Sequence, residues 1–303
     1  MNNSTANPAC NPAWRDYLEL CKPRVVSLIV FTAIVGMLLS TPGLVPLDKL
    51  IISTVGIALA AASAAAINHV AEFRIDALMA RTQNRPLPQG ELSQTQALTF
   101  ALTLGFLSMY LLVAYINVLT AVLTFSTLIG YAVIYTMYLK HATPQNIVIG
   151  GAAGAAPPVL GWTAITGTLD PNALLLFLII FAWTPPHFWA LAIYRRAEYA
   201  KAKIPMLPIT HGTEFTRLHV LLYTLLLIAA TLLPYATYMC GVIYLVGAIA
   251  LNAGFLYYAV RMQYDRSDEF AYATFKYSIL YLTLLFLALF IDHYWPLGRA
   301  AFG

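Results

Sequence analysis

The sequence is poor in charged residues and in cysteine. Asp, Glu, Lys and Arg make up 10% of its 303 residues, whereas a soluble domain carries about 25%. An ordinary water-soluble domain is therefore excluded. The three cysteines, Cys10, Cys21 and Cys240, form no CxxC pair and no cluster with histidine. We therefore expect isolated thiols and no cysteine-based metal site.

The motifs that mark many soluble enzymes are also missing. The sequence contains no glycine-rich nucleotide loop, no HExxH and no GxSxG, and each of these marks a particular soluble chemistry. Residues 1–16 are polar, with one Arg and one Asp, and they resemble neither a signal peptide nor a transit sequence. We therefore expect the first apolar run to be a retained anchor, which favours a bacterial inner membrane.

Long apolar runs dominate the chain instead. Hydrophobic residues make up 60% of it, and runs of about 20 apolar residues are typical of membrane-spanning helices. We predict an all-α polytopic membrane protein with one domain over residues 1–303, of which 1–21 form a polar cytoplasmic segment. Nine spans are expected, at about 24–42, 50–68, 95–115, 118–138, 145–163, 172–194, 218–238, 241–260 and 276–295.

Local signals mark several helix starts. Ser93 and Gln96 have the spacing of a capping box before the third span. Thr143 and Asp170 each precede a proline, which predicts a cap residue followed by proline at the first helical position.

The positions of Lys and Arg predict the orientation. With the N-terminus in the cytoplasm, the cytoplasmic segments carry fifteen of the seventeen Lys and Arg residues, and the periplasmic segments carry only Lys49 and Arg299. An excess of cytoplasmic cations is the general rule for membrane proteins. We therefore expect a periplasmic C-terminus, with the long loops 69–94 and 195–217 on the cytoplasmic face. This placement explains the net charge of +4 and predicts no nucleic-acid partner.

The end of the second span carries the clearest chemistry. Asn68, Glu72 and Asp76 follow about eighteen apolar residues in steps of four, so a helix keeps all three on one face. Arg81 and Arg85 come next and can clamp phosphate oxygens in bidentate fashion. Oxygen ligands with cations beyond them suit a hard metal ion that holds a phosphorylated substrate. The alternative is ordinary solvated polarity at a helix end.

A second group of charges follows the sixth span. Arg195 and Arg196 precede Glu198, and Lys201 and Lys203 lie beyond it. This pattern either anchors a helix end in the cytoplasm or supplies the second half of one site built from two helix ends.

An ionisable residue lies inside that same span. His187 sits between Trp183 and Trp189, next to a pair of prolines, and ionisable groups within a span are functional candidates by default. Its neutral imidazole can ligate iron or accept a proton. The sequence leaves both roles open, beside that of a hydrogen-bonded structural residue. The glycine-rich run 150–158 predicts a close helix-packing face, with a kinked cavity wall as the alternative.

These residues together resemble a known family. The run Asn68-xxx-Glu72-xxx-Asp76 resembles the aspartate-rich motif of the UbiA superfamily of intramembrane prenyltransferases. Other blocks are similar to the branch of that superfamily that farnesylates protohaem IX. They keep the order of that branch from residue 22 to residue 208: Lys22-Pro23-Arg24-Val25, Asp76 through Met79-xx-Thr82 to Asn84-Arg85-Pro86-Leu87, Tyr135-Thr136 with Leu139-Lys140, residues 143–151, residues 183–189 and Pro205-Met206-Leu207-Pro208.

The resemblance implies nine helices around a central cavity. It also implies farnesyl diphosphate as donor, haem B (protohaem IX) as acceptor, haem O as product and Mg²⁺ as cofactor. The active site would open to the cytoplasmic side of the inner membrane. Besides the lipid bilayer, haem A synthase or a terminal oxidase is the partner that the resemblance suggests.

The same resemblance assigns roles to individual residues. The catalytic candidates are Asn68, Glu72, Asp76 and His187, and the metal candidates are Asn68, Glu72, Asp76 and Glu198. The expected diphosphate-binding cations are Lys22, Arg24, Arg81, Arg85, Lys140 and Arg195. The expected pocket for haem and isoprenoid is lined by Trp162, Trp183, His187, Phe188 and Tyr199.

The chain departs from the family pattern at two positions. Glu72 stands where many relatives have Asp, which keeps the charge and adds a methylene. The second motif of the superfamily has two acids four residues apart, but here Glu198 is followed by Ala202. We therefore expect no symmetrical metal cage, since Mg²⁺ keeps water and substrate oxygens among its ligands.

Other functions fit parts of this pattern. An enzyme of the same superfamily that prenylates a small aromatic acid or a quinone precursor shares the carboxylate face, but the His187 segment and the run 84–87 favour haem. A haem-binding chaperone or transporter would use His187 and leave the carboxylate–arginine faces without a role. A purely structural oxidase subunit would explain neither feature.

Overall fold

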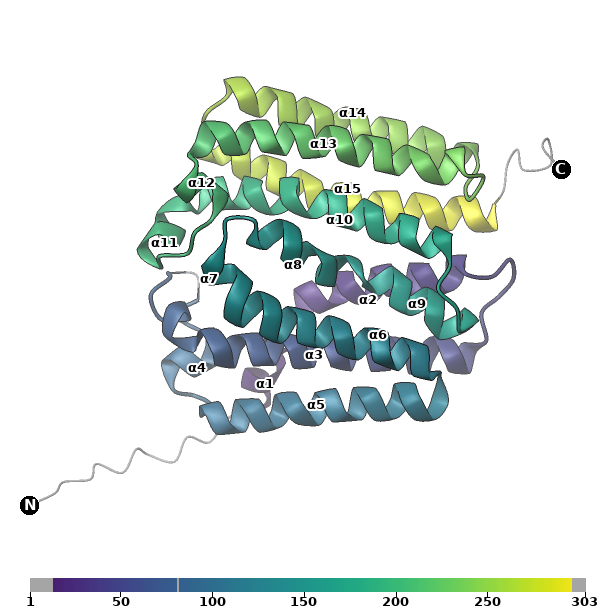
Figure 1. Ribbon diagram of the computed structural model, residues 1–303, viewed down its shortest axis with the longest axis horizontal. Helices are drawn as coiled ribbons and strands as arrows, with labels where there is room; N and C mark the ends of the chain where they lie inside the picture. Colours follow the sequence, from purple (N-terminus) through teal and green to yellow (C-terminus); the bar gives the residue numbers. More distant parts are fainter. Residues whose placement is uncertain (1–12, 81, 296–303) are drawn as a thin grey trace, which may run out of the picture.

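The computed structural model describes residues 13–80 and 82–295, and every regular element within these ranges is a helix (Figure 1). The elements are α1 (Trp14–Leu20), α2 (Pro23–Leu39), α3 (Leu47–Asp76), α4 (Pro86–Gln89), α5 (Gln94–Tyr115), α6 (Val118–Ile129), the π-helix η1 (Gly130–Leu139), α7 (Lys140–Ala142), α8 (Asn146–Ala155), α9 (Pro157–Thr166), α10 (Pro171–Tyr194), α11 (Arg196–Lys201), α12 (Leu207–Thr210), α13 (Thr213–Ala236), α14 (Val242–Tyr264) and α15 (Asp268–Tyr294).

The predicted membrane architecture is confirmed. In the described part of the chain, eight helical stretches are long and apolar enough to cross a membrane. A ninth results if the bent pair α1 and α2, which meet at 54°, counts as one span. The fifth predicted span runs through both α8 and α9, and the fourth runs through α6, η1 and α7. The orientation of the termini stays a prediction.

Two of the three predicted helix starts are confirmed. Ser93 Oγ accepts a hydrogen bond from the Gln96 backbone, and the Gln96 side chain accepts one from Ser93 N at 3.0 Å. Asp170 Oδ1 accepts from Asn172 N at 2.7 Å. The prediction at Thr143 is wrong: α8 begins at Asn146, and Thr143 Oγ1 accepts from Gln145 N at 3.2 Å. A turn closed by Asn146 N and Thr143 O delays the helix.

The long helices lie side by side and form two packed groups (Figure 1). In one group α3 packs on α5, and in the other α10 packs on α13, while α14 packs on α15. A large apolar cluster joins the second group to α2 and α9, and a smaller one joins α1, α3, α4 and α5. Between the groups lie α2, α6, α8 and α9 (Figure 1), and residues of these four helices line an interior cavity.

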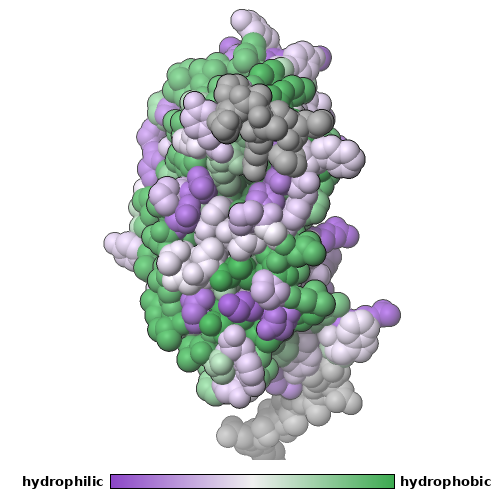
Figure 2. All heavy atoms as spheres, turned by 90° about the vertical axis from the view of Figure 1, so that its right-hand side faces the viewer, coloured by the Kyte–Doolittle hydropathy of each residue, from purple (hydrophilic) through white to green (hydrophobic). Residues whose placement is uncertain are grey.

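The two ends of the bundle differ in character. The short helices α4, α7, α11 and α12 lie at one end, at the left of Figure 1, next to the loops rich in Lys and Arg. Figure 2 looks onto the opposite end, where hydrophilic side chains are scattered between apolar ones. The charged chemistry of the described chain is therefore concentrated at one end.

Glycine allows α2 and α9 to approach closely. A Cβ on Gly161 would lie 2.1 Å from the Ala33 carbonyl oxygen, and one on Gly36 would lie 2.3 Å from that of Pro158. The glycine-rich run 150–158 breaks at Ala156, between α8 and α9. Its residues pack against other helices and also line the interior cavity, so the run combines the two roles that the sequence left as alternatives.

Cys21 and Cys240 form no disulfide, while Cys10 lies outside the described residues.

Candidate active site

A cavity of about 800 Å³ lies within the bundle. Its charged and amide side chains are Lys22, Arg24, Asn68, Glu72, Asp76, Arg85 and Lys140. Its other walls are mostly apolar and aromatic, with residues from α2, α3, α6, α8, α9, α10 and α15. The cavity therefore joins a polar mouth at the cation-rich end to an apolar interior.

One face of α3 provides the oxygen atoms of the mouth. Asn68, Glu72 and Asp76 line the cavity and are only 4%, 4% and 3% exposed. Each one contacts a cation from a different segment. Lys22 Nζ donates to Asn68 Oδ1, Lys140 Nζ pairs with Glu72 Oε1, and Arg85 Nη1 lies 2.6 Å from Asp76 Oδ2.

Breaks in the helices place these three cations. Lys22 stands at the bend between α1 and α2, with a left-handed backbone (φ 48°). Arg85 caps α4, and Thr82 Oγ1 donates to Asp76 O at 2.8 Å, which folds the loop back on the end of α3. Lys140 follows η1 directly. Arg81 lies outside the described residues.

The π-helix also fixes the amide of Asn68. Asn68 Nδ2 donates to Thr136 Oγ1 at 3.2 Å, and the Thr136 hydroxyl donates in turn to Tyr131 O at 2.8 Å. Because Nδ2 is held by Thr136, Oδ1 is the atom that accepts from Lys22. The wide turn of the π-helix, where Thr136 reaches a carbonyl five residues back, makes this arrangement possible.

The second predicted half-site does not join the first. Arg195 Nη1 pairs with Glu198 Oε1 at 2.9 Å, and neither residue lines the cavity. Glu198 Oε2 and Arg195 Nε are buried without a hydrogen-bond partner. In the described chain, no group of three or more His, Cys, Asp or Glu residues is arranged to hold a metal ion. Tyr199, one residue beyond Glu198, does line the cavity.

His187 lies on the opposite wall of the cavity, on α10. Its Nδ1 is 2.6 Å from Ser278 Oγ on α15, and its ring stacks on Trp183 and on Phe275 with centroids 4.1 and 4.6 Å away. Trp183, Phe188 and Phe275 also line the cavity. Trp162, expected in this pocket, is instead buried in the apolar core beside Val35.

Several cavity residues could not be identified from the sequence. Phe275 and Ser278 lie about ninety positions after His187, no motif in their span points to His187, and only tertiary packing brings them together. Tyr131 and Tyr135 line the cavity too. Their spacing of four residues on one apolar run was the available signal, but it also fits ordinary core packing.

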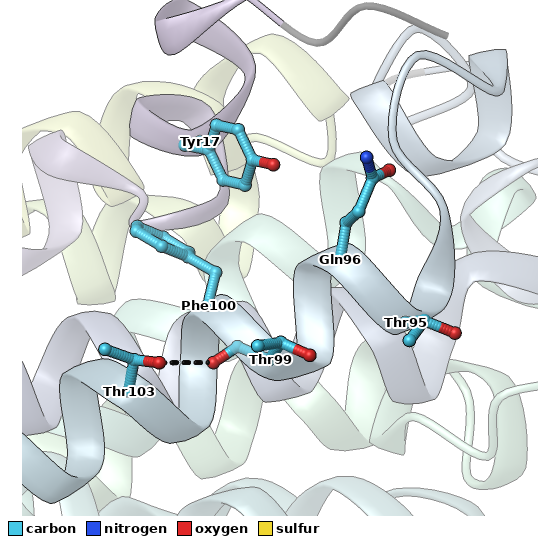
Figure 3. A pocket seen from close by; sticks show the side chains of 6 residues that line it. All are labelled: Tyr17, Thr95, Gln96, Thr99, Phe100 and Thr103. Atoms are coloured by element: carbon cyan, nitrogen blue, oxygen red, sulfur yellow. Dashed lines mark hydrogen bonds between the residues drawn. The ribbon is translucent and has the colours of Figure 1, made fainter. Parts of the chain in front are cut away.

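A second, shallower depression lies outside the bundle, between α1 and α5 (Figure 3). Its volume is about 400 Å³, and its lining residues are Tyr17, Thr95, Gln96, Thr99, Phe100 and Thr103. The rings of Tyr17 and Phe100 lie 5.0 Å apart, and Thr103 Oγ1 donates to Thr99 O. No charged side chain lines it, so the catalytic argument rests on the larger cavity.

The chain is similar to proteins of one known family. The sequence profile of the UbiA prenyltransferase family matches residues 29–296. The chain is 59% identical to the protoheme IX farnesyltransferase of Hahella chejuensis over 293 residues, covering 97% of this chain and 98% of that protein.

Solved structures share the fold at low identity. A structure concerned with digeranylgeranylglyceryl phosphate synthase matches with a TM-score of 0.78 at 20% identity, covering 92% of this chain and 98% of the other. A UbiA homologue from Archaeoglobus fulgidus bound to DMAPP and Mg²⁺ matches with a TM-score of 0.62 at 16% identity, covering 90% and 99%.

Proposed function

This chain belongs to the UbiA prenyltransferase family and is a prenyltransferase, and on that premise we propose its reaction. It transfers a farnesyl group from farnesyl diphosphate to a vinyl group of haem B, with addition of water, and gives haem O and diphosphate. The observation that carries the proposal is the cavity itself. Its cation-lined mouth suits a diphosphate, and its apolar interior with His187 suits an isoprenoid and a porphyrin.

The charges at the mouth support diphosphate binding. Four cations and two carboxylates line it, so the mouth carries an excess of positive charge. Lys22, Arg85 and Lys140 each contact an oxygen of α3, and these contacts can be exchanged for phosphate oxygens. Arg24 lines the same cavity. Charge-assisted hydrogen bonds of this kind are among the strongest that a protein makes.

The oxygen donors of α3 fit Mg²⁺. Asn68, Glu72 and Asp76 would hold it, because each carboxylate uses only one oxygen in its ion pair and Mg²⁺ completes its shell with water and phosphate oxygens. When bound, Mg²⁺ supplies neutralisation of the charge that develops on the leaving diphosphate. Glu198 is excluded from this set because it does not line the cavity.

The two substrates and one water molecule account for every bond that breaks or forms in the proposed reaction. The bond between C1 of the farnesyl group and oxygen breaks, and the diphosphate keeps the electron pair. The π electrons of the haem vinyl form the new carbon–carbon bond. The resulting cation beside the porphyrin takes a hydroxyl from water, which releases a proton.

The chain's own residues assist these changes by position and environment. Lys22, Arg85 and Lys140 stabilise charge on the departing diphosphate. The apolar cavity keeps water away from the allylic cation until the vinyl group reacts. Aromatic faces of the cavity wall, such as those of Trp183 and Phe188, stabilise the positive charge as it passes.

The location belongs to the same proposal. The helices are those of a multi-pass membrane protein, and we place them in the bacterial inner membrane with the polar mouth facing the cytoplasm. The support is the gathering of Lys and Arg at that end. A haem A synthase or a terminal oxidase that takes the product, and a single domain over residues 1–303, are parts of the proposal that rest on the resemblance.

The decisive experiment uses membranes that contain the full chain. Haem B and farnesyl diphosphate are added with and without Mg²⁺, and mass spectrometry looks for a farnesylated, hydrated haem. We expect this product only with Mg²⁺. A parallel reaction contains 4-hydroxybenzoate in place of haem B. Prenylated 4-hydroxybenzoate without any farnesylated haem would assign the chain to another branch, and bound haem without product would favour a haem carrier.

A matched pair of variants tests the site in the same assay. Asp76→Asn removes the charge at the mouth and keeps the side-chain shape, so we expect loss of product. Asp48→Asn changes an exposed carboxylate at the other end of the same helix, so we expect product to be kept. Full activity of Asp76→Asn would remove the proposed metal site from the mechanism.

A further inference from the structure

The Ser278 hydroxyl makes two short contacts inside the bundle. Its oxygen lies 2.6 Å from the Phe275 carbonyl oxygen, one turn earlier in α15, and 2.6 Å from Nδ1 of His187 on α10. Ser278 and His187 are both buried. The hydroxyl therefore links α10 to α15, two helices that both line the cavity.

Counting protons at Ser278 fixes the state of the imidazole. A hydroxyl has one proton, and a carbonyl oxygen can only accept. At 2.6 Å the contact with Phe275 O therefore uses that proton. The contact with His187 must then be a bond in which Nδ1–H donates and Ser278 Oγ accepts. A neutral imidazole that is protonated at Nδ1 carries its lone pair on Nε2.

The aromatic neighbours fix the direction of that lone pair. Trp183 and Phe275 both stack on the His187 ring, with interplanar angles of 19° and 29°. One face of an imidazole has room for one stacked ring at these distances, so the two rings cover its two faces. Trp183 is itself held because its Nε1 donates to Ser278 O at 2.8 Å.

Only one edge of the ring is left to face the cavity. Trp183 and Phe275 cover the faces, Phe188 meets the ring edge-on with centroids 5.0 Å apart, and Nδ1 is engaged, yet His187 lines the cavity. No described residue donates a hydrogen bond to Nε2. The edge that carries Nε2 is therefore the part of the ring that a bound molecule meets, and a neutral imidazole nitrogen presented in this way is the commonest metal ligand in proteins.

We propose that Nε2 of His187 is an axial ligand of the iron in a porphyrin bound in the cavity, and that Ser278 is the positioning residue that holds this tautomer. The identity of the porphyrin as haem B rests on the proposed function. Ligation tethers the flat substrate to the α10 wall, opposite the α3 face that holds the diphosphate. An imidazole that ligates metal usually donates its other N–H to a second group, and Ser278 is that group here.

The first test measures haem binding without catalysis. Purified full-length protein is titrated with ferric haem B alone, and absorption and resonance Raman spectra report the iron ligand. We expect an imidazole-ligated spectrum that is lost in His187→Ala. Ser278→Ala should keep the fold, shift the spectrum and weaken haem binding by about 10- to 100-fold, the effect typical of losing such a second group.

Matched variants separate ligation from general damage. Thr274→Ala removes another buried hydroxyl of α15, which donates to Phe270 O and does not touch His187, and His211→Ala removes an exposed histidine outside the cavity. Both should leave the spectrum unchanged. If His187→Ala does not fold well, His187→Gly with added imidazole should restore the ligated spectrum.

Two outcomes would overturn the inference. One is an iron spectrum that is unchanged in His187→Ala, and if the pH profile of product formation shifts in that variant, His187 has a proton-transfer role instead. The other is a wild-type spectrum that shows no imidazole ligand. A parallel product assay on the unaltered protein separates failure of this inference from failure of the proposed function. If it yields farnesylated haem while the spectra contradict ligation, only the inference fails, whereas absence of product removes the proposed function.

Discussion

Arg85 Nη1 lies 2.6 Å from Asp76 Oδ2, so the last acid of α3 is neutralised by a cation nine positions later in the chain. Both side chains are largely buried, and both line the cavity. The guanidinium therefore faces the position where a diphosphate would enter. Its loss should affect substrate binding and leave Asp76 without a partner.

We expect Arg85→Gln to lower kcat/KM for farnesyl diphosphate by roughly 10- to 100-fold, because a hydrogen bond to a charged group contributes about 1.5–3 kcal/mol. The KM for the diphosphate should rise more than kcat falls. Steady-state kinetics at saturating haem B measures both. Arg266→Gln, an exposed change at the same end of the bundle, is the control, and equal losses in the two variants would contradict a specific role.

Thr136 is expected to control the amide of Asn68. Thr136→Val removes the hydroxyl that accepts from Asn68 Nδ2 and frees the amide to rotate. We expect the Mg²⁺ concentration at half-maximal rate to rise by about tenfold, in the range for loss of an outer partner of a metal ligand. Ser126→Ala removes an exposed hydroxyl of α6, and its Mg²⁺ titration should match that of the unaltered protein.

The apolar end of the cavity is expected to set the length of the prenyl chain. Ile57 lines it and is almost fully buried. It precedes Asn68 by eleven residues, which is about 16 Å along a helix. Three extended isoprene units, built from bonds of about 1.5 Å, span a similar ~15 Å. A fourth unit would meet Ile57.

Ile57→Ala should therefore shift the preference toward geranylgeranyl diphosphate. We expect the ratio of kcat/KM for the longer over the shorter donor to rise roughly tenfold, the discrimination that a small apolar change supports. Competition between the two donors, read by mass spectrometry, measures the ratio. Ile51→Ala, on the exposed side of α3, serves as control, and an unchanged ratio in Ile57→Ala would place the limit elsewhere.

The contact between α2 and α9 predicts a stability effect. A Cβ at Gly161 would clash with backbone, the Ala33 carbonyl, which has no side-chain freedom to yield. Gly161→Ala should therefore cost about 1–3 kcal/mol of unfolding free energy, typical of overpacking. Thermal unfolding in detergent should give a lower Tm. Gly43→Ala, where a new Cβ meets nothing within 4 Å, should not lower it.

Short-range patterns in the sequence predicted the fold well. Apolar runs located the spans, and the capping residues Ser93 and Asp170 predicted helix starts that the structure confirms. The error at Thr143 arose because a proline two residues ahead of a helix looks the same in sequence as one at its first position. The steps of four from Asn68 to Asp76 predicted one face, and the structure has all three lining one cavity.

Relationships across the bundle could not be predicted from the sequence. The partner of each α3 side chain depends on the bend at Lys22 and on the wide turns of η1, and neither has a clear sequence signal. Glu198 was grouped with the α3 acids by analogy, but its nearest cation is Arg195, three residues away. Ser278 was missed because its importance lies only in its contact with His187.

The pairing of Glu72 with Lys140 also sets a condition on how the protein is made. The two residues are 68 positions apart, and a ribosome adds about 5–20 residues per second. The carboxylate thus emerges several seconds before its cation exists. During that interval it needs water, and its place near the end of α3, at the cation-rich end of the bundle, suits a side chain that stays hydrated until its partner arrives. The early helices can therefore insert without an unpaired charge in lipid. Glu72 pairs with Lys140 only after the ribosome has synthesised the chain beyond η1.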